Sequence, residues 1–410
     1  MSTFPKDFLW GAATSSHQVE GNNHNDWSEW EKKNAERLAK EAEQKFGTFP
    51  SWPHIKEEAQ KPENYISGIA CDHYNRFKED FDIAKQLGHN AHRFSIEWSR
   101  IEPEEGKFDD KEIEHYRDVI KALRERGLEP FVTLWHWTMP IWLAEKGGVG
   151  NRKFPFYFSR FCDRVVSAFG DEVRFYITLN EPDVFTLNSY LRGIWLPQKK
   201  SLWWYYRITA NLIRAHRAAY SSIKKIKPKA QLGVSVSLTF FESSGGFINN
   251  IVTRILHYLR NIHFLRHIRS TQDFVGVNYY FHNMFRYGMN KNKNERVSDM
   301  GWELYPEGMY QVLKDAAQYK KAIYITENGL ADMEDSQRAW FIREMLRQVS
   351  HAMQEGADIR GYFHWSLLDN FEWDKGFWPR FGLVDINRKT LERKIRPSAW
   401  EYKKIIEAGL

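Results

Sequence analysis

This chain of 410 residues contains eight short apolar runs that are separated by amphipathic segments. That pattern is compatible with few folds. Each run is rich in Val, Ile, Phe, Tyr and Trp, and polar and apolar residues alternate little within it. Such runs are typical of parallel strands that are buried on both faces. The predicted strands are 8–12, 90–96, 129–135, 174–179, 231–238, 273–280, 322–326 and 359–365.

Helical patterns lie between these runs. In 74–87 the apolar residues Phe77, Phe81 and Leu87 fall roughly on one face, and Gly88 follows as a stop signal. Strands that alternate with helices in this way predict a (β/α)8 barrel rather than a doubly wound sheet. Barrels of this kind often exceed 250 residues as one unit, so we expect a single domain over 1–410. The other clear helical patterns are 111–126, 156–169 and 339–354.

Two stretches interrupt the alternation. Residues 31–46 are rich in Glu, Lys and Ala, which predicts an exposed helix in the first βα loop. Residues 240–268 combine Ile, Leu and Phe with Arg and His. That pattern fits a basic amphipathic helix on a membrane surface, but it fits better a barrel helix whose apolar face packs on strands.

Composition excludes several classes of protein. The net charge of +6 is spread without long runs of one sign, so we expect no nucleic-acid partner. Two cysteines are too few for a disulfide framework. The first residues lack the apolar core of a secretory signal, and no apolar stretch is long enough to span a bilayer. We therefore expect a cytoplasmic protein. The 17 Trp, 19 Tyr and 28 Phe fit a ring-filled core and a sugar-binding cleft equally well.

Two glutamates end otherwise apolar strands, Glu181 after the fourth run and Glu327 after the seventh. Catalytic groups in such barrels stand at the carboxyl ends of the strands. A pair of carboxylates about 5–5.5 Å apart could cleave a glycosidic bond, one attacking the anomeric carbon while the other protonates the leaving oxygen. These roles need unequal proton affinities. Arg93 could hold one carboxylate ionised, and Tyr280 could donate a hydrogen bond to the same group.

A single glutamate at a strand end is more simply explained as the partner of a barrel arginine. Here the two glutamates share their predicted rim with His136, Asn180 and Trp365, which end neighbouring runs. That combination favours a glycoside-cleaving site over two unrelated salt bridges.

Four motifs, in order along the chain, carry a family resemblance. They are FLWGAATSSHQVEG at 8–21, TLNEP at 178–182, ITENG at 325–329 and WSLLDNFEW at 365–373. With these motifs the chain resembles glycoside hydrolase family 1, the β-glucosidase and β-galactosidase family, nearly end to end. The resemblance implies a retaining exo-β-glycosidase that removes terminal glucose, galactose or fucose from small glycosides and needs no cofactor.

The resemblance also implies roles for individual residues. Glu181 would be the general acid/base and Glu327 the nucleophile that forms a covalent glycosyl-enzyme. Asn180 would hold the sugar 2-hydroxyl, Trp365 would lie under the ring, and Phe381 would close one wall. The other implied residues are Gln18, His136, Trp137, Glu372 and Trp373 for the remaining hydroxyls, and Arg93, Asn278 and Tyr280 in support of the nucleophile.

Some positions depart from the family pattern. Thr138 follows His-Trp where Asp is common, and His17 stands where Tyr is common. The region 238–273 is trimmed or rearranged relative to the family. These departures leave the glutamate pair intact, so they bear on the leaving-group side and on the natural substrate.

Several alternatives remain beside this reading. A phospho-sugar specificity is disfavoured because a carboxylate at Glu372 would repel a phosphate, and Lys375 and Arg380 are more simply solvated rim charges. A transglycosidase would use the same glutamate pair. A non-catalytic sugar-binding barrel, or a membrane-associated one acting through 240–268, is less favoured because both glutamates are present.

Histidine spacing suggests metal sites only weakly. His89 and His92 are three residues apart, and His263 and His267 are four apart, but neither pair has an obvious third ligand. No phosphate loop or dinucleotide fingerprint is present. We therefore expect a small-molecule β-glycoside as the partner and no metal. Contact with a membrane surface through 240–268 stays a less favoured alternative, and the oligomeric state stays open.

Overall fold

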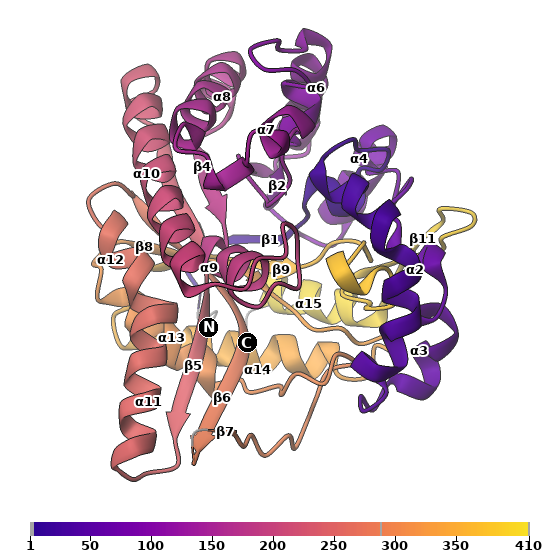
Figure 1. The fold of residues 1–410 in the computed structure, drawn as a ribbon, viewed down its shortest axis with the longest axis vertical. Coiled ribbons are helices and arrows are strands. Elements are labelled where there is room, and N and C mark those ends of the chain that lie inside the picture. Colours follow the sequence, from indigo (N-terminus) through magenta and orange to yellow (C-terminus); the bar gives the residue numbers. More distant parts are fainter. Residues whose placement is uncertain (1–3, 288, 409–410) are drawn as a thin grey trace.

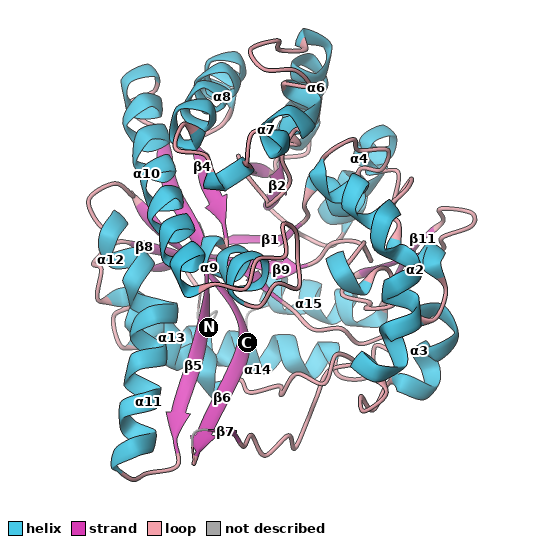
Figure 2. Cartoon of the chain, viewed as in Figure 1, coloured by secondary structure: helices cyan, strands magenta, loops and turns pink. Residues whose placement is uncertain are grey.

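A closed ring of parallel strands organises the computed structural model, which describes residues 4–287 and 289–408 (Figure 1). The sheet order is β5-β4-β3-β2-β1-β9-β8-β6, and β5 pairs with β6 to close the ring. Helices surround it, so the predicted (β/α)8 barrel is confirmed (Figure 2). The strands are β1 (Leu9–Ala13), β2 (Ala91–Ser95), β3 (Glu129–Thr133), β4 (Phe175–Asn180), β5 (Gln231–Ser243), β6 (Phe274–Arg286), β7 (Met289–Asn290), β8 (Ala322–Asn328), β9 (Ile359–Trp365), β10 (Val384–Ile386) and β11 (Arg393–Ile395).

The predicted barrel helices are present to within two residues at each end. Asp109 caps α6 by accepting hydrogen bonds from two backbone amides of the first turn. Gly127 lies just beyond the end of that helix at φ +71°, a conformation that glycine adopts without steric cost. The α-helices are α1 (Ser16–Val19), α2 (Asp26–Phe46), α3 (Trp52–Ala59), α4 (His73–Gln86), α5 (Trp98–Ile101), α6 (Asp110–Glu125), α7 (Ile141–Glu145), α8 (Phe154–Phe169), α9 (Pro182–Thr186), α10 (Leu202–Ile226), α11 (Phe247–His257), α12 (His263–Ile268), α13 (Glu307–Ala317), α14 (Arg338–Gln354) and α15 (Pro397–Ala408).

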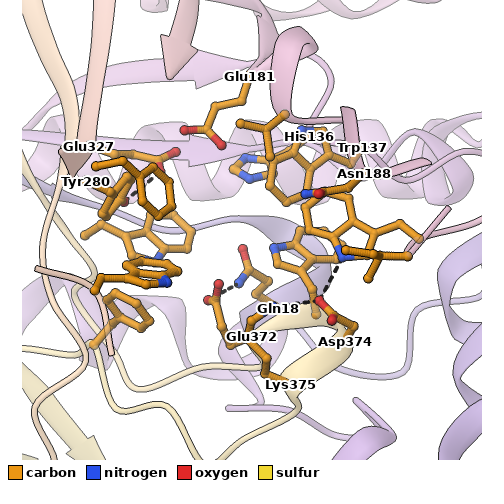
Figure 3. Close-up of a pocket in the computed structure, with 18 of the residues that line it drawn as sticks. Gln18, His136, Trp137, Glu181, Asn188, Tyr280, Glu327, Glu372, Asp374 and Lys375 are labelled. Carbon is orange, nitrogen blue, oxygen red and sulfur yellow. Dashed lines mark hydrogen bonds and ion pairs between the residues drawn. The ribbon is translucent and has the colours of Figure 1, made fainter. Parts of the chain in front are cut away.

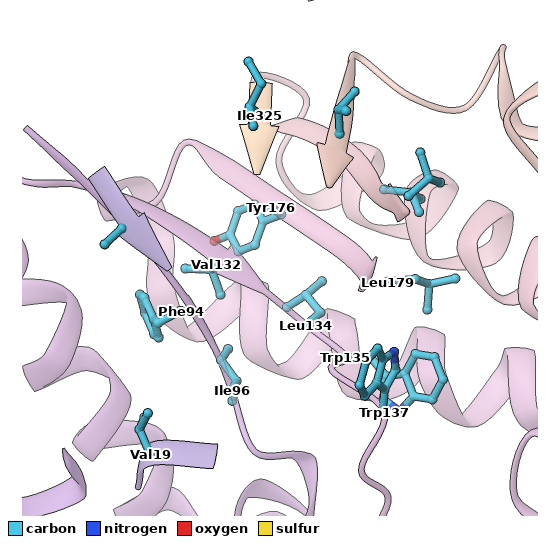
Figure 4. Close-up of a cluster of buried hydrophobic side chains, with 14 of the residues drawn as sticks. Val19, Phe94, Ile96, Val132, Leu134, Trp135, Trp137, Tyr176, Leu179 and Ile325 are labelled. Atoms are coloured by element: carbon cyan, nitrogen blue, oxygen red, sulfur yellow. The ribbon is translucent and has the colours of Figure 1, made fainter. Parts of the chain in front are cut away.

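Aromatic rings fill part of the barrel interior. Phe131 of β3 stacks on Phe175 of β4, with ring centroids 4.2 Å apart, and Tyr324 and Phe363 pack edge-on or tilted against Phe131. Alternate residues of a strand point to opposite faces. Val132, next to Phe131, accordingly belongs to the apolar layer between strands and helices (Figure 4). Both faces are thus buried, which explains the continuous apolar runs.

The helix predicted over 31–46 begins earlier and is less exposed than expected. Asn25 and Ser28 form a reciprocal capping box, so α2 starts at Asp26. Trp27 and Trp30 in the first turns are buried, and Glu31 is buried against His17. The prediction of an exposed helix was therefore wrong for this face, because the added first turn packs into the aromatic wall of the barrel mouth.

The region 240–268 is not one helix. Strand β5 continues to Ser243 and β6 to Arg286, so both extend past the barrel and pair with each other there. Helix α11 then runs back beside them (Figure 1), followed by a π-helical turn and α12. We call residues 239–257 and 281–291, apart from 288, the arm.

The two helices of this region differ in burial. Helix α12 buries Phe264, Leu265 and Ile268, as a barrel helix should. Helix α11, every residue of which the structure describes, contains no buried residue. The favoured prediction therefore holds for α12 and is wrong for α11. Within 4–287 and 289–408, no helix combines the length and apolarity needed to cross a bilayer.

Candidate active site

A cavity of about 320 Å³ opens at the carboxyl ends of the strands (Figure 3). Its lining draws on the loops after β3, β4 and β9, on strands β6 and β8, and on helix α1. Most of the predicted site residues meet here, although they are far apart in sequence. Those that line the cavity are Gln18, His136, Trp137, Glu181, Tyr280, Glu327, Trp365, Glu372, Trp373 and Phe381.

The two predicted catalytic glutamates face one space. Glu327 lies in β8, and Glu181 is the first residue after β4, just before Pro182 begins α9. The Asn278 amide donates to Oε1 of Glu181 at 2.9 Å. Both carboxylates line the same cavity and point into it (Figure 3).

Glu327 is surrounded by donors. Nη1 of Arg93 lies 2.6 Å from its Oε1, and the Tyr280 hydroxyl donates to its Oε2 at 3.0 Å. Burial raises the pKa of Glu327, whereas the Arg93 charge and these hydrogen bonds act to lower it. The contacts therefore favour the ionised form of this carboxylate.

Glu181 has a different environment. It is buried, and Asn278 is its side-chain donor. Burial raises its pKa well above the ordinary range, and the nearby charge of Glu327 raises it further. The pKa of both carboxyls is raised by burial, but Arg93 and Tyr280 oppose the rise at Glu327, whereas the charge of Glu327 adds to it at Glu181. The pair thus has the unequal proton affinities that acid/base and nucleophile roles require.

A buried polar layer supports the pair from below. Nη2 of Arg93 donates to the Asn180 side-chain oxygen at 2.6 Å, and Thr326 donates to the Asn278 oxygen at 2.7 Å. The Asn180 amide nitrogen lies 3.1 Å from Nε2 of His136. Arg93, Asn180 and Asn278 are fully buried beneath the residues that line the cavity.

The end of the cavity opposite the glutamates carries a second hydrogen-bonding group. The Gln18 amide donates to the backbone oxygen of Phe371 at 2.7 Å and to Oε2 of Glu372 at 3.3 Å. Burial raises the pKa of Glu372 to about 8. A raised pKa favours the protonated form of this carboxyl, so the charge repulsion expected against a phosphate is weaker than the sequence alone suggests.

Three residues around the cavity adopt left-handed backbone conformations. Their φ angles are +78° at Trp137, +41° at Glu181 and +51° at Trp373. Such conformations cost on the order of 1–3 kcal/mol for residues other than glycine and cluster at active sites. At these three positions the left-handed backbone belongs to residues whose indole or carboxyl group lines the cavity.

His17 and Thr138, the two residues that depart from the family pattern, each contact a buried carboxylate. Nε2 of His17 pairs with Oε1 of Glu31 at 2.6 Å, and its ring stacks on Trp373. The Thr138 hydroxyl lies 3.0–3.1 Å from both oxygens of Glu97, which is completely buried. Both substitutions are thus integrated into hydrogen-bonded networks behind the cavity wall.

Sequence reasoning missed much of the outer cavity. Trp195 donates to Asp374 at 2.7 Å, and Trp302 packs against Phe281, with centroids 4.7 Å apart. They lie in loops or past the predicted strand ends, where no periodic pattern indicates burial. The additional lining residues are Val184, Asn188, Arg192, Ile194, Trp195, Phe281, Trp302, Asp374 and Lys375.

Lys375 and Arg380, the two basic residues near the predicted sugar site, differ in their distance from the cavity. Lys375 lines the cavity and pairs with Asp374 at 2.8 Å, so it is more than a solvated rim charge. Arg380 instead pairs with Glu58 at 3.1 Å. Because each cation has a carboxylate partner, neither is an unpaired phosphate-binding charge.

Metal ligands do not converge in the described part of the chain. Among residues 4–287 and 289–408, no group of three or more His, Cys, Asp or Glu side chains could hold an ion. The His263 and His267 rings are 4.6 Å apart, whereas His89 and His92 are completely or nearly completely buried.

Comparison with known proteins agrees with this geometry. A model of glycosyl hydrolase family 1 matches residues 1–245 and 261–409. A 1,4-β-D-glucan glucohydrolase of Thermotoga neapolitana is 33% identical over 99% of this chain and 99% of its own. A β-glycosidase from Pyrococcus horikoshii superposes with a TM-score of 0.88 at 35% identity, over 100% of this chain and 96% of that one. A β-glucosidase from Thermotoga maritima, solved in complex with deoxynojirimycin, superposes with a TM-score of 0.86 at 30% identity. The match covers 100% of this chain and 99% of that one.

Proposed function

The chain belongs to glycosyl hydrolase family 1, and from that premise we propose that Glu327 is the nucleophile and Glu181 the general acid/base of this retaining exo-β-glycosidase. The unequal surroundings of the two carboxylates carry the proposal. Arg93 and Tyr280 contact Glu327, whereas burial and the neighbouring charge raise the pKa of Glu181 and so favour its protonated form. The same pair argues against a non-catalytic sugar-binding barrel.

In the first half of the reaction, an ionised Glu327 oxygen attacks the anomeric carbon of a bound β-glycoside. The bond to the leaving oxygen breaks as Glu181 transfers its proton to that oxygen, so the aglycone departs as a neutral alcohol. The product is an α-linked glycosyl ester on Glu327. Arg93 and Tyr280 stay in contact with this side chain and fix its orientation.

In the second half, Glu181 is a carboxylate. It removes a proton from a water molecule, whose oxygen attacks the anomeric carbon and displaces Glu327 as a carboxylate. The sugar leaves with its β configuration, and Glu181 is protonated again. The charge of Glu327 is neutralised while the ester exists, so it no longer raises the pKa of Glu181, which becomes a carboxylate more easily.

The substrate class we propose is a neutral β-glucoside or β-galactoside. Relatives are named β-glucosidase, 1,4-β-D-glucan glucohydrolase and β-galactosidase. Gln18 and Glu372 supply polar groups for sugar hydroxyls, with Trp373 beside them. On the outer side, Phe281 and Trp302 offer ring faces to the leaving group.

We also propose that the 410 residues act as one domain in the cytoplasm. One closed sheet links β1 near the start of the chain to β9 near its end, which favours a single unit. Cys71 and Cys162 are free and buried, as is usual for proteins of reducing compartments.

Azide rescue with an activated nitrophenyl β-glucoside tests the role assignment. In Glu327→Ala, azide occupies the space of the missing carboxylate and attacks the glycoside directly, so we expect the α-glucosyl azide. In Glu181→Ala, the ester on Glu327 still forms and azide displaces it, so we expect the β-glucosyl azide. Proton NMR of the anomeric signal distinguishes the products, and the opposite pattern would reverse the assignment.

A further inference from the structure

Helix α11 exposes a continuous apolar face. Phe247 is 79% exposed and Ile248 71% exposed, and Ile251, Ile255 and Tyr258 follow at helical spacing on the same side. Tyr287 and Met289, at the end of the neighbouring strands, are also exposed. A folded protein normally covers such large apolar side chains. Phe247 and Ile248 stand at the start of α11, next to the end of the arm, and the exposed face continues back along α11 toward the barrel. We call these exposed apolar side chains the patch.

Most of the patch lies outside the part of the chain that the family model matches. That model matches the chain up to residue 245 and again from residue 261, so all of α11 falls in the unmatched interval. Catalysis by the shared barrel therefore gives no reason for this patch.

The arm is continuous with the wall of the cavity. Phe281 lines the cavity and pairs with Thr239, and the same ladder continues to Ser243 and Phe285. Four further residues of strand span roughly 13 Å at about 3.3 Å each. The apolar tip therefore projects on the same side of the barrel as the cavity mouth, a short distance beyond its rim.

Among the described residues, the charges of the arm that lack a partner are positive. The acids beside it are paired, since Glu242 lies 3.1 Å from His282 and Asp315 lies 3.5 Å from His257. No Asp or Glu occurs in the sequence between Glu242 and Asp273, whereas Arg254 lies within this stretch. Arg286 and Lys291, on the opposite strand and its continuation, are exposed like Arg254. In the part of the chain that the structure describes, none of these three cations has a carboxylate partner, and Arg286 lies over the Tyr287 ring.

We propose that the arm docks on an anionic phospholipid surface. Apolar side chains at a projecting tip enter the acyl boundary, and guanidinium and ammonium groups around them meet the phosphates, which is how interfacial amphipathic helices bind. A second copy of the chain is a poorer occupant, because self-contact through this patch would bring Arg254 and Arg286 toward like charges. Docking would hold the cavity mouth close to the membrane surface.

Vesicle sedimentation with the full-length protein tests this. Vesicles of phosphatidylcholine alone are compared with vesicles that also contain phosphatidylglycerol, at low and high salt. We expect pelleting with the anionic vesicles that weakens at high salt. The double variant Phe247→Ser/Ile248→Ser should lose about tenfold or more in partitioning, because two large apolar groups no longer transfer from water.

A matched control separates this patch from general stickiness. Phe156 in α8 is 62% exposed on another element, and Phe156→Ser should pellet like the wild type. Arg254→Gln/Arg286→Gln should reduce binding to anionic vesicles and leave any weak binding to neutral ones unchanged. Hydrolysis of a soluble nitrophenyl glucoside verifies that each variant is folded, independently of vesicle binding.

Two outcomes overturn the proposal. One is the absence of wild-type binding to anionic vesicles at low salt. The other is a wild-type dimer in sedimentation equilibrium, without lipid, that Phe247→Ser/Ile248→Ser converts to a monomer. The latter would assign the patch to self-association.

Discussion

The floor of the cavity and the arm are built from consecutive parts of the same strands, β5 and β6, but they obey different constraints. In the barrel, Asn278 of β6 is completely buried and bonded to Glu181 and Thr326. Past the rim, Phe285 and Arg286 of the same strand are half-buried and exposed. Polar groups on the floor have fixed partners, whereas Arg286, Tyr287 and the first residues of α11 at the end of the arm are exposed. Substitutions should therefore be costly to catalysis on the floor and nearly neutral to it at the end of the arm.

The largest expected effect is at the base of the floor. Glu327→Gln keeps the shape of the side chain but removes the negative charge that attacks the anomeric carbon. We expect kcat to fall by at least about 10⁴-fold, since no other group can form the covalent ester. Steady-state kinetics on a nitrophenyl β-glucoside measure it.

A buried glutamate away from the cavity provides the control for that loss. Glu303 lies 2.5 Å from His282 behind the arm, and Glu303→Gln should retain kcat within a few-fold. Equal losses of kcat in both variants would mean that neutralising any buried glutamate lowers the activity. The loss in Glu327→Gln would then not identify the nucleophile.

Glu181→Gln should depend on the leaving group. For alkyl or sugar aglycones, which need protonation, we expect kcat/KM to fall by about 10²–10⁴-fold, and for dinitrophenolate much less. Wild-type activity requires protonated Glu181, whose pKa is raised, so kcat/KM should fall as the pH rises through that pKa. This alkaline limb should be absent from the variant assayed with dinitrophenyl glucoside, and its persistence there would exclude Glu181 as the acid.

Arg93→Lys should give an intermediate effect. Lysine cannot bond at once to Glu327, Asn180 and the Thr326 backbone oxygen, as the guanidinium does. We expect kcat to fall by about 10²-fold. The pKa of Glu327 should rise, so the acidic limb of the pH profile should move to higher pH.

The position of that limb is the decisive measurement. Arg338→Lys is the control, since Arg338 is equally buried but pairs with Asp335 away from the cavity. It should lower stability without moving the limb. An unmoved limb in Arg93→Lys would mean that Arg93 only orients its neighbours.

Thr138→Val probes the wall behind the floor. It deprives the buried Glu97 carboxylate of a hydroxyl donor, so we expect the free energy of unfolding to fall by about 1–3 kcal/mol and kcat by less than tenfold. Denaturant titration measures the first. Thr209→Val is the control, because the hydroxyl it removes donates only to a carbonyl of its own helix, so the free energy of unfolding should fall less. Equal falls in both variants would show that the contact of Thr138 with Glu97 has no special role.

The same contrast explains which parts of the fold and of the site the sequence predicts. Strands buried on both faces are continuous apolar runs, so the barrel could be predicted, and Glu181 and Glu327 were detectable because each interrupts such a run. The arm could not be, because 239–243 and 281–286 mix polar and apolar residues once one face is no longer covered. Loop residues such as Trp195 and Trp302 have no periodicity, so only the fold brings them to the cavity.

The smallest expected effect is on the arm. Phe247→Ser/Ile248→Ser removes two side chains that are mostly in water, so it loses little packing. Activity on a soluble glucoside should stay within about twofold of wild type, and the unfolding midpoint should barely move. A large loss of kcat would contradict the difference between floor and arm, since it would mean that a change in packing at the tip reaches Asn278 and Tyr280 through β5 and β6. An unchanged kcat with lost vesicle binding would support it, because one pair of strands would then hold catalytic-site residues at one end and a surface-binding site at the other.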